Sequence, residues 1–159
     1  MKNLHSIGLL ILSALLLPAC SGLKPYPDLP NKNVHLQSKL TAAGVMSGIT
    51  ADMSIHSVNE KCETTYLGTV DLDKANKDIG IVPGQLTYLY VVFSTSGLLG
   101  SSTGSTSYST LFRPKAGYEY RIDLRYKDEI YNVELFELGA GKKSARELER
   151  RSFDDCKKM

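Results

Sequence analysis

The feature that most constrains the fold of this chain is an alternation of apolar and polar residues with a period of two. Alternate positions of residues 118–126 hold large apolar or aromatic side chains: Tyr118, Tyr120, Ile122, Leu124 and Tyr126. This pattern indicates a half-buried β-strand, because successive side chains of a strand point to opposite faces of a sheet. Residues 127–129 then lead into a second apolar stretch at 130–136, so the segment predicts a β-hairpin.

Similar strand patterns recur along the chain after residue 32. They cover five further stretches, at residues 34–40, 49–56, 62–72, 86–93 and 108–112. The stretch at 86–93 is apolar on both faces, which suits a central strand. Turn-forming residues lie at 71–78 and 83–84. Six or seven short strands in a segment of single-domain length predict an all-β fold, an antiparallel β-sandwich over residues 33–159.

The last part of the chain departs from the period of two. Ser144 and Glu147 have capping-box spacing, and Glu147 and Arg151 form an i,i+4 pair of opposite charges. The sequence therefore predicts a short C-terminal helix over residues 145–153, which would bring Cys156 back to the sandwich.

Residues 1–19 have the pattern of an export signal. Lys2 supplies a positive start, and residues 7–17 form an apolar run. The run is shorter than the ~20 residues that a membrane-spanning helix needs, and Pro18 disfavours its continuation. We therefore expect a signal that is removed rather than a transmembrane anchor.

The end of the run, Leu17-Pro18-Ala19-Cys20, resembles the lipobox of bacterial lipoproteins. The resemblance implies cleavage before Cys20, lipidation of that cysteine and stable attachment to a membrane. Ser21 follows the cysteine, which resembles the pattern of lipoproteins sent to the outer membrane. The implied location is the bacterial cell envelope, at the outer membrane facing the periplasm. The alternative is an ordinary secretory signal followed by a chance cysteine.

Residues 20–32 contain prolines at near-regular intervals, Pro25, Pro27 and Pro30. This spacing favours an extended polyproline II conformation. We expect the segment to be a tether between the membrane and the domain. A ligand for a proline-recognition domain is the alternative.

Lipidation of Cys20 would leave two cysteines, Cys62 and Cys156. An even number of cysteines in an oxidising compartment favours pairing, so we predict a Cys62–Cys156 disulfide. The alternative is a pair of buried thiols.

Residues 112–122, Phe-Arg-Pro-Lys-Ala-Gly-Tyr-Glu-Tyr-Arg-Ile, resemble the strand-entry pattern of fibronectin type III and related immunoglobulin-like domains. The resemblance implies an immunoglobulin-like sandwich with a corner in which a tyrosine hydroxyl bonds to upstream backbone. The chain contains no tryptophan, so it lacks the immunoglobulin pattern in which a tryptophan lies between two paired cysteines. The resemblance therefore concerns the architecture and not a named family.

The motifs of catalytic or cofactor sites are incomplete. Residues 100–104 match G-x-S-x-G, which would make Ser102 a nucleophile, but strand-like residues follow where hydrolases have a helix. His35 and His56 lie on polar strand faces without zinc-type spacing, and residues 137–144 fail as a phosphate loop. We therefore expect no enzyme activity, no metal and no cofactor, with an enzyme based on Ser102 as the weakest alternative.

The predicted strands are rich in tyrosine, which suits binding surfaces because a rigid apolar ring carries a polar end. The candidate binding residues are Tyr88, Tyr90, Tyr118, Tyr120 and Tyr126. Ordinary packing within the sandwich is the alternative interpretation. The Ser/Thr/Gly-rich stretch at 94–110 is predicted to be a loop and an adaptable contact segment.

The charge balance excludes one class of partner. The chain has 19 Lys and Arg residues against 17 Asp and Glu residues, with no long basic run, so nucleic acid is not an expected partner. We expect a lipid-anchored, non-enzymatic binding or structural module, with an envelope protein or a wall polymer as its partner. The alternatives are an accessory lipoprotein of a secretion or surface-assembly system and an inhibitor of a hydrolase such as lysozyme.

Overall fold

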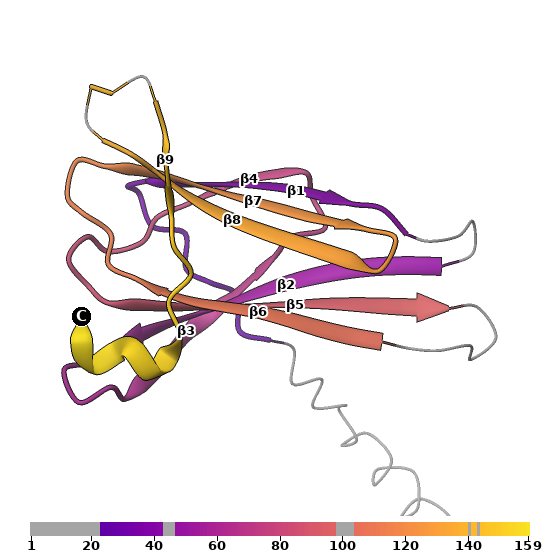
Figure 1. Cartoon of the computed structure of the whole chain (residues 1–159), viewed down its shortest axis with the longest axis horizontal. Helices are drawn as coiled ribbons and strands as arrows, with labels where there is room; N and C mark the ends of the chain where they lie inside the picture. The colour runs from indigo at the N-terminus through magenta and orange to yellow at the C-terminus, as the bar shows by residue number, and fades with distance from the viewer. Residues whose placement is uncertain (1–22, 43–46, 98–103, 140, 143) are drawn as a thin grey trace, which may run out of the picture.

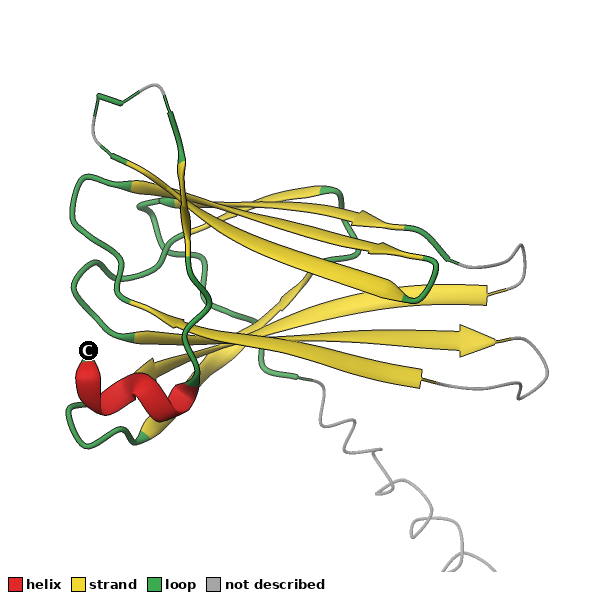
Figure 2. Cartoon of the chain, viewed as in Figure 1, coloured by secondary structure: helices red, strands yellow, loops and turns green. Residues whose placement is uncertain are grey.

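Two β-sheets packed face to face form the molecule (Figure 1). The computed structural model describes residues 23–42, 47–97, 104–139, 141–142 and 144–159. Figure 2 shows strands in both layers and a short helix near the C-terminus. The predicted all-β sandwich is confirmed.

The first sheet has the strand order β4-β1-β7-β8-β9. Its strands are β1 (Val34–Leu40), β4 (Asn76–Ile79), β7 (Glu119–Lys127), β8 (Ile130–Leu138) and β9 (Arg146–Leu148). The second sheet has the order β3-β2-β5-β6. Its strands are β2 (Ser47–Val58), β3 (Thr64–Asp71), β5 (Thr87–Gly97) and β6 (Gly104–Phe112).

Most neighbouring strands are antiparallel, as predicted, but β1 and β7 are parallel. Val34 lies opposite Tyr120 and Leu40 opposite Tyr126 in this pair. Parallel neighbours cannot be joined by a tight turn. Here the chain passes through the whole second sheet between β1 and β7, which supplies the long connection.

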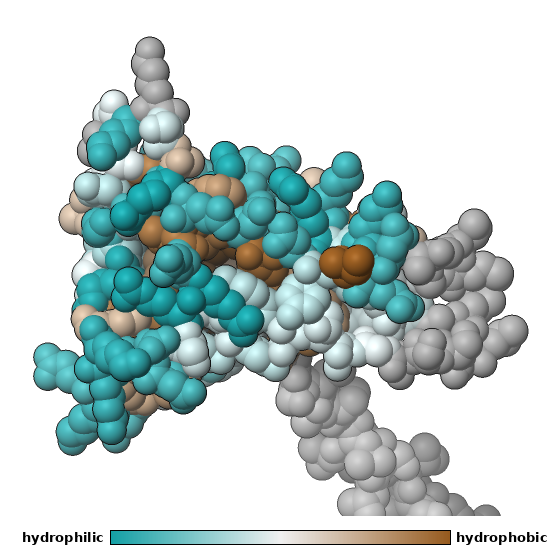
Figure 3. Space-filling view, in the orientation of Figure 1, coloured by the Kyte–Doolittle hydropathy of each residue, from teal (hydrophilic) through white to brown (hydrophobic). Residues whose placement is uncertain are grey.

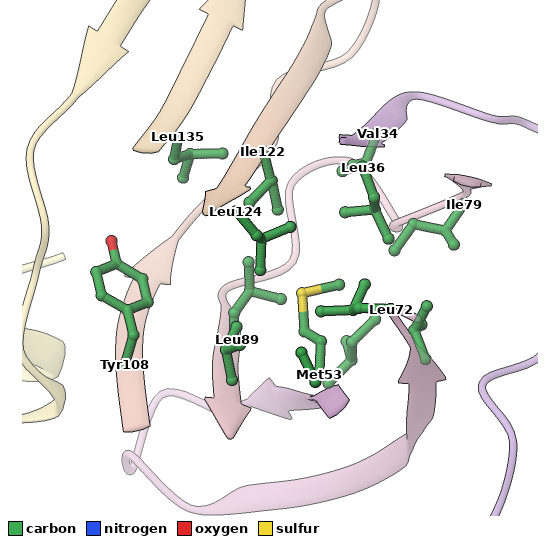
Figure 4. Close-up of a cluster of buried hydrophobic side chains, with 14 of the residues drawn as sticks. Val34, Leu36, Met53, Leu72, Ile79, Leu89, Tyr108, Ile122, Leu124 and Leu135 are labelled. Atoms are coloured by element: carbon green, nitrogen blue, oxygen red, sulfur yellow. The ribbon is translucent and has the colours of Figure 1, made fainter. Parts of the chain in front are cut away.

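Side chains that point inward from both sheets fill the space between the layers (Figure 4). The central members include Leu36, Met53, Leu89, Ile122 and Leu124, each at most 2% exposed. The alternation in 118–126 predicted the inward face of β7 correctly, and the hairpin to β8 is also confirmed. Asp128 and Glu129 adopt positive φ in its turn, the backbone geometry that matches tight hairpins.

The corner implied by the resemblance to immunoglobulin-like domains is present at Tyr120. Its hydroxyl accepts a hydrogen bond from the backbone N–H of Lys115 at 2.8 Å, five residues upstream. The ring is fully buried and packs edge-on against Phe112 at 5.4 Å. This contact fixes the crossing from the second sheet to the first.

The predicted short C-terminal helix is present, but its predicted position at residues 145–153 is wrong. Residues 146–148 form β9 instead, where Leu148 lies opposite Leu135 of β8. A 3-10 helix, η2 (Phe153–Lys158), begins only after Ser152, whose hydroxyl accepts from the N–H of Asp154. A short helix with a narrow apolar face is marginal by itself, so pairing with the edge of β8 prevails.

The N-terminal segment differs from the expected tether over its described part. Tyr26 donates its N–H to the carbonyl of Thr69 at 2.9 Å, and Thr69 donates to the carbonyl of Lys24 at 2.8 Å. Residues 24–26 therefore lie along the edge of β3. Gly68 makes this contact possible, because a Cβ atom there would come within 2.5 Å of the Cα of Tyr26. Cys20 lies outside the described residues.

Two other predicted connections are also corrected. The turn expected at 71–78 contains β4 in its second half, which pairs with β1. The loop expected at 94–110 is mostly strand, because β5 continues to Gly97 and β6 begins at Gly104. Ser102 lies between them, outside the described residues.

Candidate functional site

The predicted disulfide between Cys62 and Cys156 is confirmed, with 6.0 Å between the two Cα atoms. It joins the connection between β2 and β3 to η2. A small hydrophobic cluster surrounds it, formed by Val58, Leu86, Leu111 and Cys156. The bond therefore holds η2 against the outer face of the four-stranded sheet.

The five candidate tyrosines occupy three different environments. Tyr120 and Tyr126 are 0% and 5% exposed and belong to the core, so their assignment to a binding surface is corrected. Tyr118 is half-buried, with the Lys115 ammonium 5.0 Å from its ring centre. Tyr88 is half-buried and Tyr90 is 37% exposed on the outer face of the second sheet, so these two remain candidates for a binding surface.

The structure gathers further aromatic rings around these two tyrosines. We call this group the aromatic face; it consists of His56, Tyr66, Tyr88, Tyr90 and Phe153. The strand register creates it, because His56 of β2 lies directly opposite Tyr66 of β3 and Tyr88 of β5. The ring centres of His56 are 5.3 Å from Tyr66 and 5.9 Å from Tyr88.

Two more contacts complete the aromatic face. Tyr88 and Tyr90 stack at 6.5 Å, and Phe153 of η2 meets Tyr88 edge-on at 5.3 Å. Tyr66 and Tyr90 are each 37% exposed, so their rings remain available to a partner. The disulfide supports this arrangement, because it holds the helix that carries Phe153.

The polar groups of the aromatic face determine its charge. Burial lowers the pKa of His56, which favours the neutral imidazole near neutral pH. The hydroxyl of Tyr66 lies 2.7 Å from that of Thr69 and donates to the carbonyl of Lys24 at 3.2 Å. Within the described part of the chain, no hydrogen bond involves the hydroxyls of Tyr88 or Tyr90. The aromatic face therefore offers uncharged rings, and its three tyrosines carry hydroxyl groups at their ends.

Carboxylates border the aromatic face farther along β2. Burial raises the pKa of Asp52, and the nearby negative charges of Asp71 and Asp73 raise it further. The same outer surface therefore changes from aromatic to acidic along the strands. A ligand of the aromatic face that extends in this direction would meet carboxylate acceptors.

A second group of side chains, which we call the polar cluster, consists of Glu137, Lys115, Tyr120 and Arg146. Lys115 Nζ is 2.9 Å from one carboxylate oxygen and Arg146 Nη2 is 3.1 Å from the other. Burial alone would raise the pKa of Glu137, but Lys115, Tyr120 and Arg146 prevail and lower it. The side chain of Glu137 is only 9% exposed and its charge is compensated, so this cluster has a structural role joining β8, β9 and the corner.

The structure does not bring the other candidate residues, the two histidines, close to each other. His35 lies on the first sheet, with Nδ1 2.8 Å from Asp78 Oδ1, while His56 lies on the second. Ser102 falls in a part of the chain that is not described. In the described residues, no group of three or more His, Cys, Asp or Glu side chains is placed to hold a metal ion.

Sequence reasoning found Tyr88 and Tyr90 but missed the rest of the aromatic face. His56 was identified only as a surface histidine, and Tyr66 and Phe153 were not singled out. The missing information is the register between β2, β3 and β5, which a single sequence does not contain. The position of Phe153 also depends on the disulfide.

Comparison with family models, curated proteins and solved structures gives no match. No helix among the described residues is long and apolar enough to cross a membrane.

Proposed function

We propose that this chain is a lipid-anchored protein of the bacterial cell envelope that binds a protein or a wall polymer, without catalysis, through the aromatic face. The aromatic face carries this proposal. Five rings from β2, β3, β5 and η2 form one surface, and two of them are more than one-third exposed.

The physical properties of this surface suit binding. A tyrosine ring buries a large apolar area and loses little conformational entropy, because its side chain has few rotatable bonds. Here the strand ladder and the ring contacts already fix the side chains, which lowers the cost of ordering them in a complex. The neutral His56 adds apolar surface without a charge that binding would have to desolvate.

The anchor and the aromatic face would lie close together. Lys24 contacts both Thr69 and Tyr66, and it is only four residues after Cys20. At ~3.6 Å per residue, an extended chain of four residues spans at most roughly 14 Å. Lipid on Cys20 would therefore keep the β3 edge and Tyr66 near the membrane surface. This geometry favours a partner in the same membrane or directly beside it.

The lipid anchor is tested with Cys20→Ser. We expect this variant to lose incorporation of a palmitate analogue and to leave the membrane fraction. Cys62→Ser is the matched control, because it changes an exported cysteine without removing the lipidation site. Unchanged labelling and fractionation of Cys20→Ser would contradict lipidation.

The binding surface is tested by photo-cross-linking in cells, with benzoylphenylalanine at position 66 or 90. We expect the same discrete adduct from both positions. Position 76 is the control, because Asn76 is exposed but lies on the edge strand β4 of the other sheet. An adduct of equal strength at position 76, or none at 66 and 90, contradicts binding through the aromatic face. Digestion of the adduct with protease or with a wall hydrolase identifies its class.

A further inference from the structure

The sheet edges of the described residues differ in how they are protected against further strand pairing. An unprotected edge is open to another strand, and proteins guard edges with charges, short strands or covering segments. The edge strand β4 has only four residues, two of them Lys77 and Asp78, and β9 has only three. Residues 24–26 cover β3, and Glu134 places a charge on the part of β8 that β9 leaves uncovered.

In the part of the chain that the structure describes, the first half of the edge strand β6 lacks these protections. Its nine residues, Gly-Ser-Thr-Ser-Tyr-Ser-Thr-Leu-Phe, include no charge and no proline. Among the described residues, parts of the chain other than β5 bond only to its C-terminal half. Leu111 donates its N–H to the carbonyl of Arg151 at 3.0 Å, and Arg150 Nε donates to the carbonyl of Ser109 at 2.9 Å.

The backbone of the first half of β6 has hydrogen-bonding groups directed away from the sheet. Backbone groups alternate in direction along a strand, and the N–H of Leu111 points away from β5. The N–H and C=O groups of Ser107 and Ser105 therefore point the same way. Both residues are exposed, and within the described residues no hydrogen bond from outside β5 reaches their backbone. Figure 3 shows pale, uncharged surface along this part of the molecule.

A hollow and one exposed apolar side chain lie near this open backbone. A hollow of about 250 Å³ separates the start of β6 from the turn between β7 and β8, and Phe93 and Tyr126 line it with Thr106 and Glu129. Ile130, next to Glu129, is 73% exposed. A strand added to β6 would therefore gain backbone hydrogen bonds and lie near the exposed side chain of Ile130.

We infer that β6 of a second copy of this chain pairs antiparallel with β6, joining two four-stranded sheets into one continuous sheet. A two-fold interface brings the same surface of both copies together, so the surface must be self-complementary. The first half of β6 meets this condition, because an uncharged strand of Ser, Thr and Gly can face itself without like-charge repulsion. The contacts of residues 150–151 already show that a backbone acceptor and a side-chain donor can bond to this edge. The inference concerns a surface different from the aromatic face and does not depend on lipidation.

The first test uses Ser107→Pro in the protein as the cell makes it, whether purified from membranes or from soluble extract. Proline removes an N–H that points away from β5, so the β5–β6 ladder keeps its bonds. We expect a concentration-dependent dimer in sedimentation equilibrium and an increase in its Kd of at least about tenfold in the variant. Ser107→Ala is the matched control and should dimerise as the unchanged protein does. Circular dichroism establishes that both variants are folded.

The second test is disulfide cross-linking in cells, with single cysteines introduced in turn at Gly104, Ser105, Thr106 and Ser107. We expect a product of twice the chain mass that peaks at the residues nearest the two-fold axis. Cysteine in place of Asn76, on the edge strand β4, is the control. A monomer at every soluble concentration, or a dimer unaffected by Ser107→Pro, overturns the inference. Cross-linking of β6 to a different protein also overturns it, since a partner strand would then occupy the edge.

Discussion

At the scale of single residues, one hydroxyl group joins the two ends of the polar cluster. The hydroxyl of Tyr120 accepts from the N–H of Lys115 and donates to Glu137 Oε2 at 3.3 Å. Glu137 in turn binds the side chains of Lys115 and Arg146. This buried hydroxyl acts as both donor and acceptor, and it stabilises the crossing between the sheets. It is the hydrogen-bond acceptor of the backbone N–H of Lys115.

Tyr120→Phe tests this role. The variant keeps the buried ring but removes the acceptor of the part-buried N–H of Lys115, and a hydrogen bond of this kind contributes about 0.5–1.5 kcal/mol. We expect the free energy of unfolding in urea to fall by that amount. Tyr88→Phe is the control, because no hydrogen bond in the described part of the chain involves its hydroxyl. Equal stability of the two variants would show that the corner bond contributes nothing.

The charge of Glu137 predicts a pH dependence of stability. Its pKa in the folded protein lies below the ordinary value of 4.5, so the folded state favours the ionised carboxylate. The stabilisation is therefore complete above pH 4.5 and is lost as the pH falls through the lowered pKa. We expect Glu137→Gln to be less stable than the unchanged protein at pH 7 and the difference to shrink below pH 4.5. A difference that grows on acidification would contradict this assignment.

At the scale of elements, the sequence predicted what periodicity controls and missed what distant contacts control. The strands with strong alternation, such as β7, lie where expected. The short strands β4 and β9 were missed, because three or four residues carry little periodic signal and each forms by pairing with an existing edge. The candidate site was only partly predicted, because contacts between distant segments also determine which side chains it contains. Tyr88 and Tyr90 follow from composition, whereas His56 and Tyr66 join them through register.

The docked N-terminal segment provides a prediction at this scale. Gly68 has a φ of +151°, and a Cβ atom there would lie 2.5 Å from Tyr26 Cα. We expect Gly68→Ala to displace residues 24–26 and to lower the free energy of unfolding by about 1–3 kcal/mol. The amide of Thr69, which donates to Lys24, should then exchange its hydrogen faster. Gly104→Ala is the control, because its Cβ would meet only the Thr95 hydroxyl at 3.2 Å. Unchanged protection of Thr69 would contradict the docking.

At the scale of the whole molecule, the described residues form two hydrophobic clusters of unequal size. The larger one fills the space between the sheets, and the smaller one lies around the disulfide under η2. The segment from β9 to Arg151 links the two sheets, because β9 pairs with β8 of the first sheet and Arg151 bonds to Leu111 of β6 in the second. The disulfide therefore closes a loop of large sequence separation and also holds one side of the aromatic face in place.

The double variant Cys62→Ala/Cys156→Ala separates these two effects. Removing a native disulfide from a small domain costs about 2–5 kcal/mol, so we expect global stability to fall by that amount. We also expect hydrogen exchange to accelerate first in residues 153–158, because they belong to the smaller cluster, while β1 and β7 remain protected until global unfolding. Leu36→Ala, which removes a core side chain at a similar cost of about 2–5 kcal/mol, is the control. It should leave the protection of 153–158 relative to the core unchanged. If the double variant shifts every amide equally, the disulfide stabilises the molecule only as a whole and does not hold η2 against the sheet.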